Sequence, residues 1–351
     1  MRIVFLAWRD TAHPQAGGSE VVIDQLASRL TERGHQVELL HGGPSGTHLY
    51  RSTRIGGNYS QYLRAPFSFF RRRRGVDVVI DVENGIPYFS PLWQRIPVIG
   101  LVHHIHTEQW RMQFPEPIAA VGRWLEGRLM PLVYRRAPFV TVSPSTTNGL
   151  ADLGIAPSHI TTIEMGLDFD PLEPAPSTEP RFIVLSRLVP HKRVELALKM
   201  WDSVRPVTGG TLVIVGDGPE LDNLQAIAGP SVEFTGWVDE DRKRSELSQA
   251  WVLIHPAHHE GWGTVVMEAA SASVPTLAFD VAGVRDSVDN GVSGLLASNE
   301  TEFIEKWISL ASQPSRRTQM ADAARLRAAT FTWDRAVDMF EAILHKTVRE
   351  Q

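Results

Sequence analysis

Short apolar runs alternate with amphipathic segments along nearly the whole chain, and this alternation restricts the possible folds more than any other feature. The first half has apolar runs at 2–7, 36–41 and 97–102, and the second half repeats the pattern from 182–186 and 211–215 onward. Runs of this length separated by helical stretches are typical of parallel strands joined by crossover helices. The sequence therefore predicts an α/β fold with parallel sheets.

The length of the chain, 351 residues, predicts two domains, because single hydrophobic cores rarely grow this large. Residues 169–180 read FDPLEPAPSTEP, a polar and Pro-rich stretch without periodicity, and are expected to link the domains. The expected divisions are a first domain at 1–170, a second domain at 181–330 and a last helix at 331–351.

Composition and charge exclude several classes of protein. The absence of Cys excludes a disulfide scaffold and thiolate chemistry, and the net charge of −5 argues against a nucleic-acid partner. The first residues read as a strand rather than a signal peptide, so a cytoplasmic protein is expected. Residues 1–170 nevertheless hold 17 Arg and no Lys. The run Arg71–Arg74 is either a solvated loop or a surface for an anionic partner such as a lipid headgroup at the inner membrane face.

The stretch at 251–286 contains the strongest candidate site. An apolar run, a Glu-Gly-Trp-Gly turn and a helix from Thr264 follow one another, with Glu260 in the turn and Glu268 in the second helical turn. The backbone N–H groups around Gly263, Thr264 and Val265 are the unpaired donors of the helix start, a favourable place for phosphate oxygens. A sugar joined through pyrophosphate to a ribose suits this layout, because a carboxylate accepts hydrogen bonds from a hydroxyl pair at either end. The alternative is two ordinary surface glutamates.

A basic turn follows the apolar run at 182–186. Arg187 and Lys192 lie on this turn and can clamp a pyrophosphate, although such a pair is also common as plain surface charge. The Gly216-Asp217-Gly218 turn has Leu221 where a dinucleotide fingerprint needs a third glycine, which argues against NAD.

Two short motifs in the first half are weaker candidates. Gly17-Gly18 precedes a helix and leaves N–H donors for a ligand, or merely makes a tight bend. His103-His104 follows the run at 97–102, at the strand end where doubly wound sheets bind ligands. These histidines orient a hydroxyl, cap a loop or, with His106, belong to a metal cluster that no spacing demands.

Two Asp-x-Asp strings raise the question of a metal. They are Asp168-Phe169-Asp170 at the linker and Asp239-Glu240-Asp241 at a probable helix start, where acids are common. Both are read as structural, so no metal and no other cofactor is expected.

Taken together, these motifs resemble those of the family-4 retaining glycosyltransferases, which carry a Glu-x7-Glu signature. The resemblance covers the whole chain and is strongest from 183 to 296. It implies a GT-B fold, with two Rossmann-like domains facing a central cleft and the helix at 331–351 crossing back to the first domain. It also implies that helices near 118–136, where a break is expected at Pro131, contact lipid-linked acceptors; a plain sheet-covering helix is the alternative.

The resemblance assigns roles to the candidate residues. Glu260 and His103 would hold the donor sugar, and Glu268 would hold the ribose. Further donor contacts are implied for the nucleobase at Val238 and for the phosphates at Arg187, Lys192, Gly17 and Gly18.

The implied activity is transfer of a hexose-type sugar from a nucleotide diphosphate sugar to a hydroxyl, with retention of configuration and without a metal. UDP is favoured over GDP, and the acceptor is a small molecule, a glycan or a lipid-linked compound. Peripheral membrane contact through the first domain is compatible with this activity. The alternatives are a sugar-nucleotide epimerase of the same fold and a non-catalytic sugar-nucleotide-binding protein.

Overall fold

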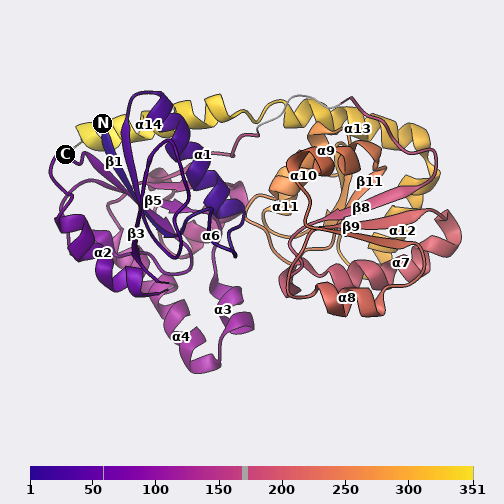
Figure 1. The fold of residues 1–351 in the computed structure, drawn as a ribbon, viewed down its shortest axis with the longest axis horizontal. Helices are drawn as coiled ribbons and strands as arrows, with labels where there is room; N and C mark the ends of the chain where they lie inside the picture. Colours follow the sequence, from indigo (N-terminus) through magenta and orange to yellow (C-terminus); the bar gives the residue numbers. More distant parts are fainter. Residues whose placement is uncertain (58, 168–172, 351) are drawn as a thin grey trace. The chain divides into compact units, whose positions relative to one another are not determined.

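The computed structural model describes residues 1–57, 59–167 and 173–350, and the chain divides into two compact units. The first unit comprises Met1–Gly166 with Trp333–Gln351, and the second comprises Leu167–Thr332 (Figure 1). The expected linker at 169–180 falls partly outside the described residues. In its described part, Ala175 and Ser177 donate backbone hydrogen bonds of 3.1 Å to Ser248 and Gln249 of the second unit.

The first unit contains a seven-stranded sheet in the order β3-β2-β1-β4-β5-β6-β7, and every neighbouring pair is parallel. The predicted strands at 2–7, 36–41 and 97–102 are confirmed as β1, β2 and β5. The strands are β1 (Arg2–Arg9), β2 (Gln36–Gly42), β3 (Arg51–Gly56), β4 (Val78–Glu83), β5 (Val98–Val102), β6 (Phe139–Thr141) and β7 (Ile160–Thr162).

Helices cover this sheet, and the last helix of the chain is one of them. In the first unit α14 packs on α1, β4 and β5 (Figure 1). The rings of Phe5 of β1 and Phe340 of α14 stack with centroids 6.4 Å apart. The α-helices of the unit are α1 (Gly18–Glu32), α2 (Ser60–Phe70), α3 (Thr107–Gln113), α4 (Glu116–Trp124), α5 (Met130–Val133), α6 (Pro144–Asp152) and α14 (Trp333–Arg349).

The second unit contains a six-stranded parallel sheet in the order β10-β9-β8-β11-β12-β13. Its strands are β8 (Arg181–Leu185), β9 (Thr211–Val215), β10 (Val232–Gly236), β11 (Val252–His255), β12 (Thr276–Phe279) and β13 (Gly294–Ala297). Its α-helices are α7 (Val194–Thr208), α8 (Leu221–Ile227), α9 (Glu240–Gln249), α10 (Thr264–Ser271), α11 (Val284–Ser287), α12 (Glu300–Ser312) and α13 (Pro314–Ala328).

The core of the second unit is built on large aromatic side chains. Phe182 of β8 lies edge-on to Trp201 and Trp307, with ring centroids 5.6 and 5.4 Å away, and all three side chains are buried. Burial of one such side chain contributes about 1.5–3 kcal/mol. This packing fixes β8, whose carboxyl end carries the basic turn. Across the described residues of both units, no helix is long and apolar enough to cross a membrane.

One predicted detail is wrong. The helix expected at 118–136 does not break at Pro131, which lies inside α5. The distortion comes earlier, as a π-helical turn over Leu125–Leu129. Proline has no N–H to donate, and its ring clashes with the carbonyl four residues back, at Gly127; the wider turn relieves both problems.

Candidate active site

Two turns of the second unit meet at the carboxyl ends of β8 and β11, which are neighbours in the sheet. The turn after β8 carries Lys192, at the end of the short 3-10 helix Pro190–Lys192, and the turn after β11 carries Glu260. The Lys192 ammonium donates a hydrogen bond to Glu260 Oε1 and forms an ion pair with it. The N–H of His258 also donates to the carbonyl of His191 at 3.0 Å. Two residues that are far apart in the sequence are therefore paired at one point.

Glu260 is held in its ionised form. Its side chain is only 13% exposed, and His255 Nε2 lies 3.1 Å from Oε1. Burial alone would raise the pKa of this carboxyl, but Lys192 and His255 outweigh burial and hold the pKa far below its usual range. Glu260 is therefore an ionised hydrogen-bond acceptor in a sparsely hydrated position.

The basic turn concentrates positive charge. Burial, together with the charges of Lys192 and Arg187, lowers the pKa of His191 to about 4, although Glu260 acts in the opposite direction. Arg187 is exposed, so its guanidinium is accessible from solvent. A turn with two permanent cations and a neutral imidazole suits an anion such as a pyrophosphate.

Close backbone contacts hold the Glu-Gly-Trp-Gly turn in place. Gly283 has a φ of +79°, and a Cβ at this position would lie 2.2 Å from the carbonyl oxygen of Glu260, so no larger residue fits. Trp262 is buried and packs edge-on against Phe331, with ring centroids 5.1 Å apart. The turn that positions Glu260 is thus anchored from two directions.

The start of α10 offers open N–H donors. Gly263 caps this helix with a φ of +80°, in the left-handed region that favours glycine. Among the described backbone hydrogen bonds outside regular helix pairing, the first donors of this segment are Val266 and Met267, both bonded to the carbonyl of Gly263. The N–H groups of Gly263, Thr264 and Val265 precede them, and Thr264 is exposed. This geometry suits phosphate oxygens.

Glu268 belongs to a different pair. Its Oε1 lies 2.9 Å from Lys243 Nζ of α9, which also contacts Glu240 at 2.8 Å. Burial lowers the pKa of Lys243, but Glu268 and Glu240 outweigh burial and raise it. Val238 lies in the loop between β10 and α9, so it adjoins the helix that carries Lys243. The structure thus brings Glu260 to Lys192 and Glu268 to Lys243.

Buried polar groups without partners mark the carboxyl edge of the first sheet. Glu83 ends β4, pairs in register with Val102 of β5 and is 2% exposed. His103 follows β5 directly and is 7% exposed. Within the described part of the chain, neither carboxylate oxygen of Glu83 and neither ring nitrogen of His103 has a hydrogen-bond partner. Such atoms are rare in folded proteins, and a bound water, ion or ligand is one explanation for them.

Burial shifts the pKa of both groups toward the neutral form. Burial raises the pKa of Glu83 well above its usual value, and Glu126 and Asp81 add to this effect by repulsion. Burial lowers the pKa of His103 to about 4, with repulsion from His106 adding to it. A protonated carboxyl group and a neutral imidazole can each donate and accept hydrogen bonds, so a shift toward these forms suits hydroxyl groups.

The other histidines of the loop have local partners. The backbone N–H of His106 donates to Glu126 Oε1 at 2.5 Å, and its Nε2 lies 3.2 Å from Asn84 Oδ1. His104 Nε2 lies 3.1 Å from Gln109 Oε1. Across the described residues, no three or more His, Cys, Asp or Glu side chains are arranged to hold a metal ion. Of the two Asp-x-Asp strings, the first lies outside the described residues. In the second, Asp239 caps α9 by accepting from Arg242 N at 2.8 Å.

The Gly17-Gly18 turn differs from its expected role in one respect. The N–H of Gly17 donates to Glu20 Oε2 at 2.8 Å, so in this structure that donor is bonded within the protein. Glu20 is buried and also contacts Arg9 Nε at 3.3 Å. The start of α1 is therefore closed from one side, by the Glu20 side chain that accepts from the backbone N–H of the N-cap residue Gly17.

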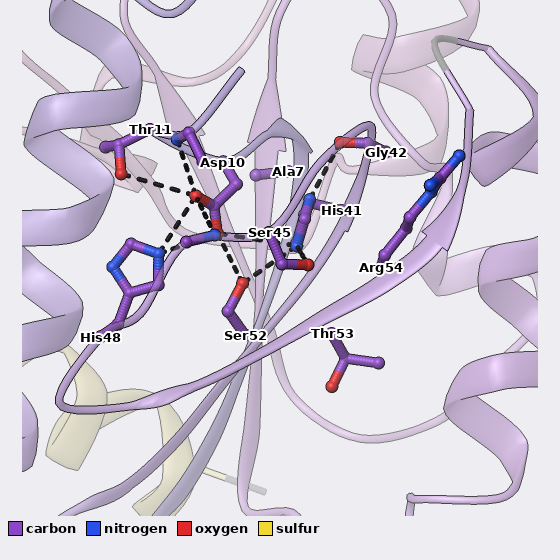
Figure 2. A network of polar contacts seen from close by, with 12 residues as sticks. Ala7, Asp10, Thr11, His41, Gly42, Ser45, His48, Ser52, Thr53 and Arg54 are labelled. Atoms are coloured by element: carbon purple, nitrogen blue, oxygen red, sulfur yellow. Dashed lines mark hydrogen bonds and ion pairs between the residues drawn. The ribbon is translucent and has the colours of Figure 1, made fainter.

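A buried network around Asp10 fixes the loop that leads to this turn (Figure 2). Asp10 accepts from Ala12 N at 2.9 Å, from Gly46 N at 3.1 Å and from Ser52 Oγ at 2.5 Å. His48 Nε2 lies 3.0 Å from the same carboxylate. Burial raises the pKa of Asp10, but these hydrogen bonds outweigh it and lower the pKa. The network ties together the loops that follow β1 and β2.

Sequence reasoning did not identify Glu83, Lys243 or His255 as site residues. A signal existed for Glu83, because an acid ends the apolar run VVIDVE at the sheet edge where ligands bind. No local signal existed for Lys243, which meets Glu268 across 25 residues of sequence.

Comparison with known proteins identifies the family. The model "Glycosyltransferase Family 4" matches residues 16–171, and the model "Glycosyl transferases group 1" matches residues 169–327. The two matches follow one another along the chain and together span both units. The chain belongs to the family-4 glycosyltransferases of the GT-B fold.

Curated relatives are similar over different lengths. The GDP-mannose-dependent alpha-(1-6)-phosphatidylinositol monomannoside mannosyltransferase of Mycobacterium tuberculosis is 31% identical over 39% of this chain. The match spans 42% of that protein, which is less than half of its length. The N-acetyl-alpha-D-glucosaminyl L-malate synthase of Bacillus anthracis is 22% identical over 97% of each chain.

Solved structures share the fold at low identity. Sucrose-phosphate synthase from Thermosynechococcus elongatus superimposes with a TM-score of 0.83 at 16% identity, covering 100% of both chains. HepE from Anabaena in complex with UDP gives a TM-score of 0.81 at 16% identity, covering 99% of this chain and 100% of that one. The predicted GT-B class, with two Rossmann-like α/β domains, is confirmed.

Proposed function

We propose that this protein transfers a hexose-type sugar from a nucleotide diphosphate sugar to a hydroxyl group. The observation that carries the proposal is the arrangement around α10. Glu260, in the turn before α10, is paired with Lys192. Glu268, in the second turn of α10, is paired with Lys243 of α9. In the proposed complex the sugar binds at Glu260, the phosphates bind at Lys192, Arg187 and the N–H groups of Gly263 to Val265, and the ribose binds at Glu268.

GDP-mannose is the donor we propose to test first. The support comes from sequence relatives, since the mycobacterial mannosyltransferase with 31% identity is named as GDP-mannose-dependent. The sequence alone favoured UDP, and the UDP-sugars remain the comparison group. Val238 is proposed to lie beside the nucleobase, so exchanging the base tests this part of the site.

The proposed chemistry retains the configuration of the sugar. The bond from the anomeric carbon to the phosphate oxygen breaks, the bond to the acceptor oxygen forms on the same face, and the acceptor proton passes to the leaving phosphate. The task of the protein is then to stabilise the negative charge that grows on the pyrophosphate. Lys192 and Arg187 do this, while Lys192 moves from Glu260 toward the phosphates. No metal takes part in this scheme.

Groups on the first unit are proposed to serve hydroxyls. His103 is proposed to position a sugar hydroxyl, and the buried acid Glu83 extends this role, because both have unused hydrogen-bonding atoms in the described structure. Gly17 is proposed to contact phosphate only if its N–H leaves Glu20, whereas Gly18 needs no such exchange.

The acceptor is proposed to be a hydroxyl of a glycan or a lipid-linked compound. The relatives include proteins named for phosphatidylinositol-based substrates. Ile118, Val121 and Trp124 of α4 are 54–57% exposed. Exposed apolar groups on one helix suit the surface of a membrane, so peripheral contact through this helix is part of the proposal.

The experiment is a donor and acceptor matrix. The purified chain is incubated with GDP-mannose or UDP-glucose, with and without glycan and glycolipid acceptors, and release of the nucleoside diphosphate is measured. Release that depends on both one donor and one acceptor supports transfer, and proton NMR of the product reports the anomeric configuration. Sugar isomerisation without an acceptor would instead indicate an epimerase. Binding of the nucleotide sugars without any turnover would indicate a binding protein.

A further inference from the structure

A hollow on the surface of the first unit is lined by arginines from three separate segments. Arg2 is the first residue of β1, Arg51 is the first residue of β3, and the others lie between α2 and β4. The lining residues are Arg2, Arg51, Arg71, Arg72 and Arg74. Because all strands of this sheet are parallel, the hollow lies at the amino edge, opposite the edge that carries Glu83 and His103. A strand of eight residues such as β1 spans roughly 25 Å, which separates the two edges.

The acidic groups near the hollow do not balance its charge. Glu38 of β2 is the shared partner, with Arg72 Nε at 3.1 Å, Arg51 Nε at 3.5 Å and a terminal nitrogen of Arg2 at 3.7 Å. The side chain of Glu38 is only 5% exposed, so it lies beneath the guanidinium groups. The other nearby acid, Asp77, accepts the backbone N–H of Arg2 at 2.7 Å. Five cations therefore face two carboxylates.

Besides the shared carboxylate of Glu38, backbone carbonyls hold two of the arginines in position. The guanidinium of Arg2 donates to the carbonyl of Arg74 at 2.6 Å, and that of Arg72 donates to the carbonyl of Ser68 at 2.9 Å. Arg71 and Arg74 are exposed. Like charges held this close repel one another, and a multivalent anion would relieve the repulsion. The planar guanidinium group binds phosphate oxygens in pairs, which selects phosphate-bearing anions.

We propose that this hollow binds an anion that carries phosphate groups with at least two negative charges. The proposal is independent of the proposed transfer reaction, because none of its residues belongs to the candidate active site. The anion is either a soluble phosphorylated compound or the headgroup of an anionic lipid. Leu63, Phe67 and Phe70 of α2 are 62–80% exposed immediately before Arg71, and only a lipid would also cover these apolar groups.

The test is calorimetric titration with inorganic pyrophosphate at low ionic strength. The titration uses the full chain carrying Lys192→Ala, which weakens pyrophosphate binding at the proposed donor site. In this background we expect Arg71→Ser with Arg74→Ser to weaken pyrophosphate binding at least ten-fold. The matched control is Arg135→Ser with Arg136→Ser, an exposed arginine pair of the same unit outside the hollow, which should leave the affinity unchanged. Equal weakening by both pairs, or none by the first, would overturn the proposal.

Vesicle sedimentation then assigns the source of the anion. If the wild-type chain sediments with phosphatidylglycerol vesicles but not with phosphatidylcholine vesicles, and pyrophosphate releases it, the anion is a lipid headgroup. If pyrophosphate binds but no vesicle sediments the chain, the anion is a soluble compound. Both results support the site, whereas pyrophosphate affinity that survives Arg71→Ser with Arg74→Ser contradicts it for either source. Failure here leaves the transfer assay unaffected, so the two proposals can be judged separately.

Discussion

The carboxyl edges of the two parallel sheets occupy the same place in the topology but differ in their electrostatics. At the edge of the second sheet, carboxylates are paired with lysines, as Glu260 is with Lys192. At the edge of the first sheet, Glu83 and His103 are buried and without partners among the described residues, and burial shifts the pKa of both toward the neutral form. Charged pairs can exchange partners with a charged ligand, whereas neutral unpaired groups offer hydrogen bonds to an uncharged one.

This contrast suggests that the two sheets, which share one architecture, bind different chemical groups of the substrates. The second edge suits phosphates and a ribose, and the first edge suits hydroxyl groups. The same strand-to-loop geometry therefore supports both kinds of recognition, and the difference comes from the side chains that follow each strand.

Loss of the lysine at the second edge should have the largest effect. Lys192→Ala is expected to lower kcat/KM at least ten-fold, a loss of about 1.4 kcal/mol or more, because charge developing on the phosphates loses its cation. Arg187→Ala should show a loss of at least the same size. The control is Lys199→Ala, a lysine of the same unit whose side chain is 72% exposed and which should leave kcat/KM unchanged. Near-normal turnover with Lys192 and Arg187 both replaced would contradict the proposal that these residues bind the phosphates.

Substitution of the two glutamates of the second edge should distinguish contacts to the sugar from contacts to the nucleotide. Glu260→Gln is expected to reduce turnover strongly while the affinity for the free nucleoside diphosphate stays within about two-fold, a difference near 0.4 kcal/mol. Glu268→Gln should weaken the free nucleoside diphosphate itself by several-fold. Calorimetric titration of both variants measures this directly. The reverse pattern would exchange the two roles.

The buried acid of the first edge should show itself in the pH dependence of stability. Burial raises the pKa of Glu83 in the folded state above its value in the unfolded chain. Between these two pKa values the folded chain keeps a proton that the unfolded chain has lost. The free energy of unfolding therefore decreases as the pH rises through this range. Glu83→Gln is neutral at every pH and lacks this penalty. The unfolding free energy of the variant, relative to the wild type, should therefore rise steadily as the pH is raised from 5 to 8. Urea titrations measure this, and a constant difference across that range would show that Glu83 is ionised when folded.

The histidine of the first edge should give the smallest effect. Its pKa is lowered to about 4, so between the unfolded value near 6.5 and about 4 the unfolded chain binds a proton that the folded chain does not. His103 should thus lower stability as the pH falls through this window. NMR of the ring should show no titration of His103 between pH 8 and pH 5. A midpoint near 6.5 would place the ring in contact with solvent.

Most regular elements could be predicted from apolar periodicity, and the exceptions have physical causes. The strand β3 reads RSTRIG and lies at the edge of its sheet, where one side faces solvent, so it has no continuous apolar run. The helix α2 contains Pro66 and exposes Leu63 and Phe67, which disturbs both of the usual helix signals.

The candidate site could be predicted where its residues share one turn or one helix. Glu260 and Glu268 follow from the spacing around α10, and Arg187 and Lys192 follow from one turn after β8. Their partners could not be predicted in this way. Lys243 of α9 meets Glu268 of α10 across 25 residues of sequence, and no spacing encodes that contact. His255 ends β11 and meets Glu260 five residues later, because the turn folds back onto the end of its own strand.

The central claim is that the second unit binds the nucleoside diphosphate around α10, and hydrogen exchange of the full chain tests it most directly. Amide exchange is followed by mass spectrometry with and without saturating GDP, with UDP in parallel. Bound phosphate oxygens would accept the backbone N–H groups at the helix start and slow their exchange. We predict slower exchange in peptides covering 187–192 and 260–268. Unchanged exchange in both segments at saturating nucleotide would contradict the account.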